Sequence, residues 1–228
     1  MSNTLEPQIR CKLLLLNGPP GCGKDTVATA LKNYAQQKGL NVRNVVIMKC
    51  AAPIKAAYPS LLGRTNSDEL DLLKDEEYLG VPRGIRKVQI ALSEDVMKPI
   101  FGQDIFARIL AKKVACLHSN ILCIISDCGF MTEYKYLFYR TPRNNFLTLR
   151  LSRGNTTFEG DSRSYIHEGF DAEQLKQHRI MDVNNDIDIK SSVDGYIDLI
   201  ARNLHIDYDI MRLDLSNIYE FTALNTKR

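Results

Sequence analysis

The segment from Leu13 to Thr26 constrains this chain more than any other part of its sequence. It reads LLLLNGPPGCGKDT, an apolar run followed by three glycines, a lysine and the start of a helical pattern. Gly18 to Lys24 has the spacing G-x-x-x-x-G-K that is typical of a phosphate-binding loop between a strand and a helix. Glycines let successive backbone N–H groups point inward around an oxyanion, and the helix N-terminus adds its positive dipole end. The segment therefore predicts a nucleoside triphosphate site, with Lys24 on the β- and γ-phosphates.

The residues of this loop are the first candidate ligands. We expect ATP to contact Gly18, Gly21, Cys22, Gly23, Lys24, Asp25 and Thr26. The residue after the lysine is usually Ser or Thr, whose hydroxyl binds Mg²⁺, but here it is Asp25. A carboxylate also holds Mg²⁺, directly or through water, so Asp25 is a predicted metal ligand. The alternative is a plain Gly-Pro-Pro-Gly turn, but the strand, the spacing, the lysine and the helix onset all favour the phosphate loop.

Composition places the chain among ordinary globular proteins. Its 228 residues fit one sizeable α/β domain, and 44% are hydrophobic and 25% charged. A formal net charge of only +3 argues against nucleic acid as a partner; the partners expected from the phosphate loop are small-molecule nucleotides. The first ten residues are polar, and the apolar run after them is too short to cross a membrane, so no membrane partner is expected.

Apolar runs alternate with helical patterns along most of the chain. Strands are expected at about 12–16, 44–49, 121–126 and 146–151, with a last strand at either 181–183 or 186–189. Helices are expected at about 24–37, 67–78, 83–98, 103–118, 132–140, 172–179 and 193–204. This alternation predicts an α/β fold with a central five-stranded parallel sheet and right-handed crossovers.

We expect one domain with two interruptions. Its core covers about residues 11–50 and 103–204, and the long segment 51–102 between the second and third strands is expected to be a helical, acceptor-binding insertion. A polar stretch with glycines, at about 152–170, is expected to form a lid that excludes water. The tail, 205–228, contains many apolar residues, so we expect it to pack on the domain or on a second subunit.

The third expected strand, 121–126, leads into Asp127, Cys128, Gly129 and Phe130. Because parallel strands end at the same edge of a sheet, Asp127 should lie beside the phosphate loop. A carboxylate there can hold magnesium-bound water, which makes Asp127 a predicted catalytic and metal-binding residue; a helix cap is the alternative. Phe130 is a candidate to pack on the base of a substrate, and a core aromatic is the alternative.

Phosphoryl transfer needs positive charge around the moving group, and the predicted lid carries arginines. We expect Arg150 and Arg153 to act in catalysis and Arg163 to bind ATP. The alternative is that Arg150 is a sheet-edge residue and that the other two are solvated.

The insertion carries a second set of cations. Arg83, Arg86 and Lys55 are predicted to bind the acceptor, because arginine grips a phosphate with two parallel hydrogen bonds. A basic helix face balanced by the acidic run 68–77 is the alternative, and it accounts for most of these charges.

Three short patterns resemble the phage-type deoxynucleoside monophosphate kinases. They are the Gly-Lys-Asp-Thr ending of the loop, Ala52-Pro53-Ile54-Lys55 after the second strand, and Ser126-Asp127 before Phe130 and Glu133. The resemblance covers about residues 11–204 and implies a three-layer P-loop kinase fold that transfers the γ-phosphate of ATP to a (deoxy)nucleoside 5′-monophosphate with Mg²⁺. It also implies a cytoplasmic location (host cytoplasm if phage-encoded) and, as in many members, a homodimer.

Other interpretations of the same residues remain. Animal-type phosphomevalonate kinases share the Gly-Lys-Asp ending and are the nearest alternative. The resemblance predicts Asp-x-Arg-Phe after the third strand, where this chain has Asp127-Cys128-Gly129-Phe130, so Arg83 or Arg86 is expected to replace that arginine. A nucleotide-binding switch and a degenerate kinase used as an interaction module are two further hypotheses. The long insertion argues against the first and the intact Lys24 against the second.

Overall fold

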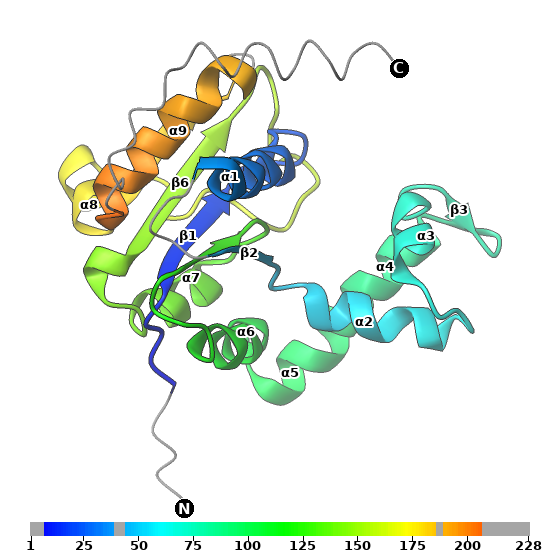
Figure 1. Ribbon diagram of the computed structural model, residues 1–228. Helices are drawn as coiled ribbons and strands as arrows, with labels where there is room; N and C mark the ends of the chain where they lie inside the picture. Colours follow the sequence, from blue (N-terminus) through cyan, green and yellow to red (C-terminus); the bar gives the residue numbers. More distant parts are fainter. Residues whose placement is uncertain (1–6, 39–43, 186–188, 207–228) are drawn as a thin grey trace, which may run out of the picture.

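The computed structural model describes residues 7–38, 44–185 and 189–206. Figure 1 shows a central sheet with helices on both faces and a helical insertion beside it. Five parallel strands form the sheet in the order β2-β5-β1-β6-β7. They are β1 (Lys12–Asn17), β2 (Asn44–Met48), β5 (Ile121–Ile125), β6 (Phe146–Ser152) and β7 (Ile180–Asn184). The predicted α/β class and five-stranded parallel sheet are confirmed, and the last strand lies at the first of its two expected positions.

Side chains of the strands alternate between two cores, because neighbouring residues of a strand point to opposite faces. In β1, Leu13 and Leu15 pack on the side of α6 and α7, whereas Leu14 and Leu16 pack on the side of α1 and α9. The helices of the core are α1 (Lys24–Lys38), α6 (Ile105–Ala115), α7 (Met131–Phe138), α8 (Ala172–Gln177) and α9 (Ile189–Leu204), with a 3-10 turn, η2, at Arg143–Asn145. The arrangement is therefore the predicted three layers.

The insertion stands beside this core (Figure 1). It contains α2 (Ala52–Leu61), α3 (Ser67–Leu72), β3 (Glu77–Tyr78), β4 (Val81–Pro82), α4 (Gly84–Ala91), a π-helical turn η1 (Leu92–Met97) and α5 (Lys98–Phe101). The helix predicted at 67–78 is too long, because β3 and β4 form an antiparallel hairpin there. Leu79 and Gly80 have φ of 51° and 74° at its turn, a conformation that a helix does not allow.

Helix α2 has no counterpart among the predicted helices. Pro53 lies in its first turn and Pro59 inside it, and proline in a helical pattern normally indicates a break. The burial of Ile54, Tyr58 and Pro59 shows that packing against the core outweighs this local preference. The helix expected at 83–98 exists, but as α4, η1 and α5 in succession.

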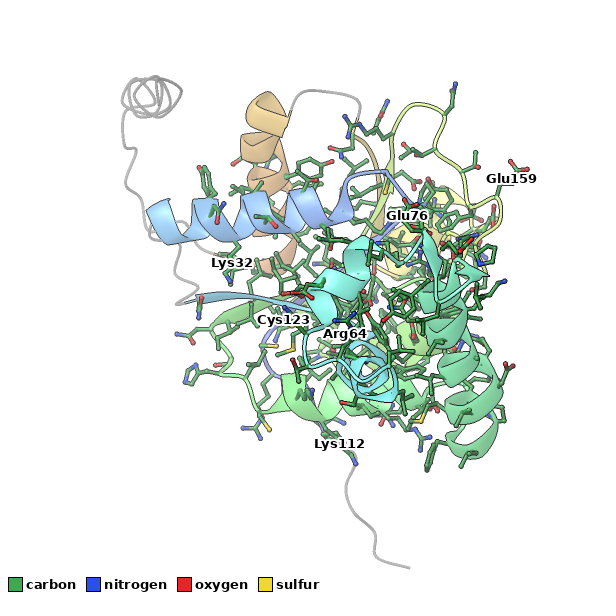
Figure 2. All side chains as sticks on the ribbon, turned by 90° about the vertical axis from the view of Figure 1, so that its right-hand side faces the viewer. Lys32, Arg64, Glu76, Lys112, Cys123 and Glu159 are labelled. Carbon is green, nitrogen blue, oxygen red and sulfur yellow. The ribbon has the colours of Figure 1, made fainter. Side chains whose placement is uncertain are left out.

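Between β6 and α8 the chain forms neither helix nor strand over residues 153–171, which is where the lid is predicted. Figure 2 views the molecule from the side of the insertion and shows the exposed Glu159 at the outer margin of this segment. Residues 207–228 lie outside the described residues, so the packing expected for the tail is a prediction. Among the described helices, none combines the length and the apolar character needed to cross a bilayer.

Candidate functional site

The loop between β1 and α1 has a conformation that requires glycine. Gly21 and Gly23 have φ of 80° and 93°, in the left-handed region that other residues rarely adopt. At Gly18 a side chain would come within 2.4 Å of the backbone oxygen of Leu151, and at Gly23 within 2.5 Å of the Asn185 amide. The spacing of these glycines is therefore a backbone requirement of this loop.

Lys24 turns its ammonium group back into the same loop. Its Nζ donates to the backbone oxygens of Gly18 at 2.6 Å and Pro19 at 2.7 Å, and it lies 3.7 Å from Cys22 Sγ. Burial lowers the pKa of Lys24, and the thiol of Cys22 acts in the opposite direction. The loop thus places one positive charge where the motif expects the terminal phosphates, with Cys22 buried beneath it.

Asp25 follows at the exposed start of α1, where Thr26 is also exposed. Its carboxylate lies 2.9 Å from Lys49 Nζ and accepts a hydrogen bond from Ser126 Oγ at 2.8 Å. Burial acts to raise the pKa of Asp25, but the hydrogen bonds from Lys49 and Ser126 outweigh it and lower the pKa. An ionised carboxylate is thus held where the ends of β2 and β5 meet the phosphate loop.

Asp127 lies at the same edge, as predicted, but both of its oxygens have backbone partners. They accept hydrogen bonds from the N–H groups of Cys50 at 2.7 Å and Ala51 at 3.0 Å. Burial raises the pKa of Asp127, and these two hydrogen bonds act in the opposite direction. The carboxylate therefore fixes the junction between β2 and α2, and its catalytic and metal-binding roles stay predictions.

The oxygen donors near the loop suit Mg²⁺. Asp25 and Ser126 offer a carboxylate and a hydroxyl, and hard oxygen ligands are those that Mg²⁺ prefers. In the described part of the chain, no group of three or more His, Cys, Asp or Glu side chains could enclose a metal ion.

The predicted arginines of the lid occupy different surroundings. Arg163 pairs with Asp161, which raises the pKa of the guanidinium, and its charge acts on Asp127 and Lys24. Arg150 donates to both carboxylate oxygens of Asp182 at 2.6 Å and to two backbone oxygens at the end of the 153–171 segment. Arg153 is exposed at the start of that segment. The structure thus brings Arg163 to the loop, whereas Arg150 ties β6 to β7.

The predicted acceptor residues are paired within the insertion. Lys55 forms an ion pair with Asp71, and Arg83 and Arg86 both pair with Asp75. Figure 1 shows α3 and α4 standing apart from β1 and α1, so the structure does not bring these two arginines to the phosphate loop.

Phe130 directly precedes α7 and lies next to the C-terminal end of the insertion. The Lys98 ammonium lies over its ring, 3.9 Å from the centroid, and also pairs with Glu94 at 2.6 Å. The Lys98 side chain is only 3% exposed. The predicted substrate residue Phe130 is thus near the core end of the insertion, next to a buried cation.

Two asparagines that the sequence did not single out join the parts of the site. Asn17 is fully buried; it donates to the backbone oxygens of Cys128 and Ser164, and accepts from the N–H of Ile166. Asn185 donates to the backbone oxygen of Cys22 and accepts from the Tyr196 hydroxyl. Each stands at the carboxyl end of its strand, and this position was the signal that could have indicated them.

Glu133 adds a second carboxyl group behind Asp127. Its side chain is buried in the first turn of α7, and one carboxyl oxygen, Oε2, has no hydrogen-bond partner among the described residues. Burial, together with the neighbouring Asp127 charge, raises the pKa of Glu133 to about 7. A carboxyl group that is partly protonated near neutral pH therefore lies against the site.

No family model and no curated protein sequence matches this chain. Among solved structures it is similar to a sugar kinase from Janibacter sp. HTCC2649 and to TT1252 from Thermus thermophilus, at 14% and 15% identity. Each similarity covers 86% of this chain and 98% of the other, with a TM-score of 0.43. A shikimate kinase from Bacteroides thetaiotaomicron is 15% identical over 82% of this chain and 97% of its own, with a TM-score of 0.37. All three TM-scores are below 0.5, so the functional proposal depends on the site itself.

Proposed function

We propose that this protein is a kinase that transfers the γ-phosphate of ATP, with Mg²⁺, to a (deoxy)nucleoside 5′-monophosphate. One observation carries the proposal. The Lys24 ammonium is held inside a loop whose backbone only glycine can form, with the ionised Asp25 beside it. A cation, a glycine cradle and an oxygen ligand for magnesium are the parts that phosphoryl transfer requires.

Each part has a defined task in this proposal. The loop N–H groups and Lys24 bind the β- and γ-phosphates, where negative charge develops during transfer. Asp25 and Ser126 would hold Mg²⁺, which neutralises charge on the phosphate oxygens when it is bound. Asn185, through the Cys22 carbonyl, and Asn17, at the end of β1, keep the loop and its neighbours in place. The protein thus supplies position and charge rather than covalent chemistry.

The choice of a phosphate acceptor rests on Asp127. A hydroxyl acceptor needs a carboxylate to accept its proton. Asp127 is the predicted carboxylate, and each of its oxygens already accepts one backbone hydrogen bond that fixes it to the β2–α2 junction. A monophosphate is an anion and needs no base. It needs cations instead, and Arg163 and Lys49 supply them on the β5 side of Lys24. A nucleoside is the proposed remainder of the acceptor, with Phe130 as the ring that packs on its base.

The test is a coupled assay of ADP release with a panel of acceptors. The panel contains the ribo- and deoxyribonucleoside monophosphates, phosphomevalonate and other non-nucleotide phosphates, and shikimate or sugars as hydroxyl acceptors. We expect turnover with at least one nucleoside monophosphate. Turnover with a non-nucleotide phosphate alone would favour the phosphomevalonate-type alternative, and turnover with a hydroxyl acceptor alone would overturn the argument from Asp127.

A further inference from the structure

The Arg163 side chain packs against the backbone at Gly129, where there is no side chain. A Cβ atom at Gly129 would come within 2.5, 2.7 and 2.8 Å of the Cδ, Cγ and Cβ atoms of Arg163. Contacts below 3.0 Å require something to move, and here three successive atoms of one side chain are involved. The conformation of Arg163 therefore depends on the absence of a side chain at position 129.

The backbone conformation at position 129 does not itself require glycine. Its φ is outside the left-handed region, so alanine fits the local backbone, and the contact with Arg163 is the obstacle. This separates Gly129 from Gly21 and Gly23, whose φ values favour glycine whatever surrounds them.

The backbone at Arg163 and directly after it is fixed by hydrogen bonds, beginning with the Arg163 N–H to Asp161. The Ser164 N–H bonds to the Gly129 oxygen, and Asn17 binds the Ser164 oxygen and the Ile166 N–H. Asp161 holds the guanidinium through Nε and Nη2, at 2.9 and 2.5 Å. Arginine has five N–H donors, so Nη1 remains to bind a ligand, having no hydrogen-bond partner in the part of the chain that the structure describes.

The guanidinium is close enough to the phosphate loop and to the end of β5 for its charge to act on both. Its charge acts on Lys24 of the loop and on Asp127 and Glu133 after β5. A phosphoryl group that moves from the loop toward an acceptor near β5 would pass this position. Planar guanidinium groups stabilise the charge that such a group carries.

We propose that Gly129 is a positioning residue for phosphoryl transfer: its missing side chain lets Arg163 lie across the end of β5 and contact the phosphoryl group in transit. This inference rests on the proposed function. An arginine was expected where this chain has Gly129. The proposal assigns the role of that arginine to Arg163 of the 153–171 segment, rather than to Arg83 or Arg86 of the insertion.

The test is a mutant cycle at the two positions, measured with the best acceptor of the panel. We expect Gly129→Ala to lower kcat about 10- to 100-fold and Arg163→Gly to lower it about 100-fold, with KM for ATP changed less than threefold in both. The double variant should be no slower than Arg163→Gly, because Gly129 acts only through the Arg163 side chain. Gly195→Ala, at an open position of α9, is the matched control and should keep the wild-type kcat.

A swapped variant excludes a purely structural role. Gly129→Arg combined with Arg163→Gly returns a guanidinium to this place and removes every Arg163 side-chain atom that a Cβ at position 129 would meet. We expect it to recover at least tenfold in kcat over Arg163→Gly. Neither this variant nor Arg163→Gly contains the contact that could hinder folding of Gly129→Ala. Additive losses in the cycle, a wild-type kcat for Gly129→Ala, or no recovery in the swap would each overturn the inference while leaving the kinase itself established. A wild-type protein without phosphoryl transfer to any acceptor would overturn the proposed function and this inference together.

Discussion

The edge of the sheet around the phosphate loop and the insertion are built in different ways. At the sheet edge, buried or half-buried side chains bind backbone groups of neighbouring segments, as Asn17, Asn185 and Asp127 do. In the insertion, a more exposed ion pair, Arg86 with Asp75, joins α4 to the turn after α3. Apart from Tyr139, the exposed large apolar side chains of the described chain all lie between Leu61 and Phe101.

This difference separates two tasks. Buried hydrogen bonds to the backbone are costly to lose, whereas exposed ion pairs contribute little and exchange readily. The part that is proposed to bind ATP is therefore rigidly specified, whereas the insertion, where the sequence predicts acceptor-binding residues, tolerates changes in its charges. Four substitutions test this difference between the two regions.

Lys24→Ala should have the largest effect, on activity rather than on stability. The proposed transition state loses one full charge, which is expected to lower kcat/KM about 100- to 1000-fold. The ammonium bonds only to loop oxygens and a thiol, so the midpoint of thermal unfolding should change little. Steady-state kinetics and calorimetry measure the two quantities. Lys112→Ala, at an exposed position of α6, is the control (Figure 2), and equal activity in both variants would remove Lys24 from the site.

Asn17→Ala should destabilise the fold most. It removes three hydrogen bonds and leaves buried backbone groups without partners, which we expect to cost about 2–4 kcal/mol of unfolding free energy. Asn66→Ala is the matched control in the insertion, where the side chain caps α3 at an exposed position, and should cost about 1 kcal/mol. Urea denaturation compares them; a larger loss for Asn66→Ala would contradict the contrast between the two regions.

Glu133→Gln should change the pH dependence of stability. Burial raises the pKa of Glu133 from an ordinary 4.5 to about 7, so the folded state binds this proton more tightly than the unfolded chain does. The free energy of unfolding therefore falls as the pH rises from about 4.5 to about 7, by about 3 kcal/mol at most. Glutamine carries no such proton, so the free energy of unfolding of the variant, measured relative to wild type, should be higher at about pH 8 than at about pH 5. An equal difference from wild type at the two pH values would show that the pKa of Glu133 is not raised.

Arg86→Ala should have the smallest effect on stability. Its ion pair with Asp75 joins a half-buried and an exposed side chain, and such pairs contribute about 0.2–1 kcal/mol. If the arginine binds the acceptor as predicted, KM for the monophosphate should rise while KM for ATP stays the same. An unchanged KM for both substrates would leave Arg86 with only its role on the insertion surface.

Sequence reasoning was strongest where one local pattern fixes the backbone. The glycine spacing and Lys24 indicated the loop because they act within a few residues of each other. The sequence predicted the insertion least well. There α2 contains two prolines and was not predicted, and the β3–β4 hairpin interrupts an expected helix. There the packing of Ile54 and Tyr58 and the turn at Leu79 outweigh local preference.

The strand–loop–helix unit, the parallel sheet and the placement of Asp25 and Asp127 at one edge follow from the amino-acid sequence alone, because periodicity and the ends of parallel strands depend on local order along the chain. The partners of these groups depend on the folded structure. It directed Asp127 to two backbone N–H groups and Arg150 to Asp182, and placed Arg163 across Gly129. Such pairings join residues far apart in the chain, and their selection depends on the space and the hydrogen-bonding groups that the folded chain brings together.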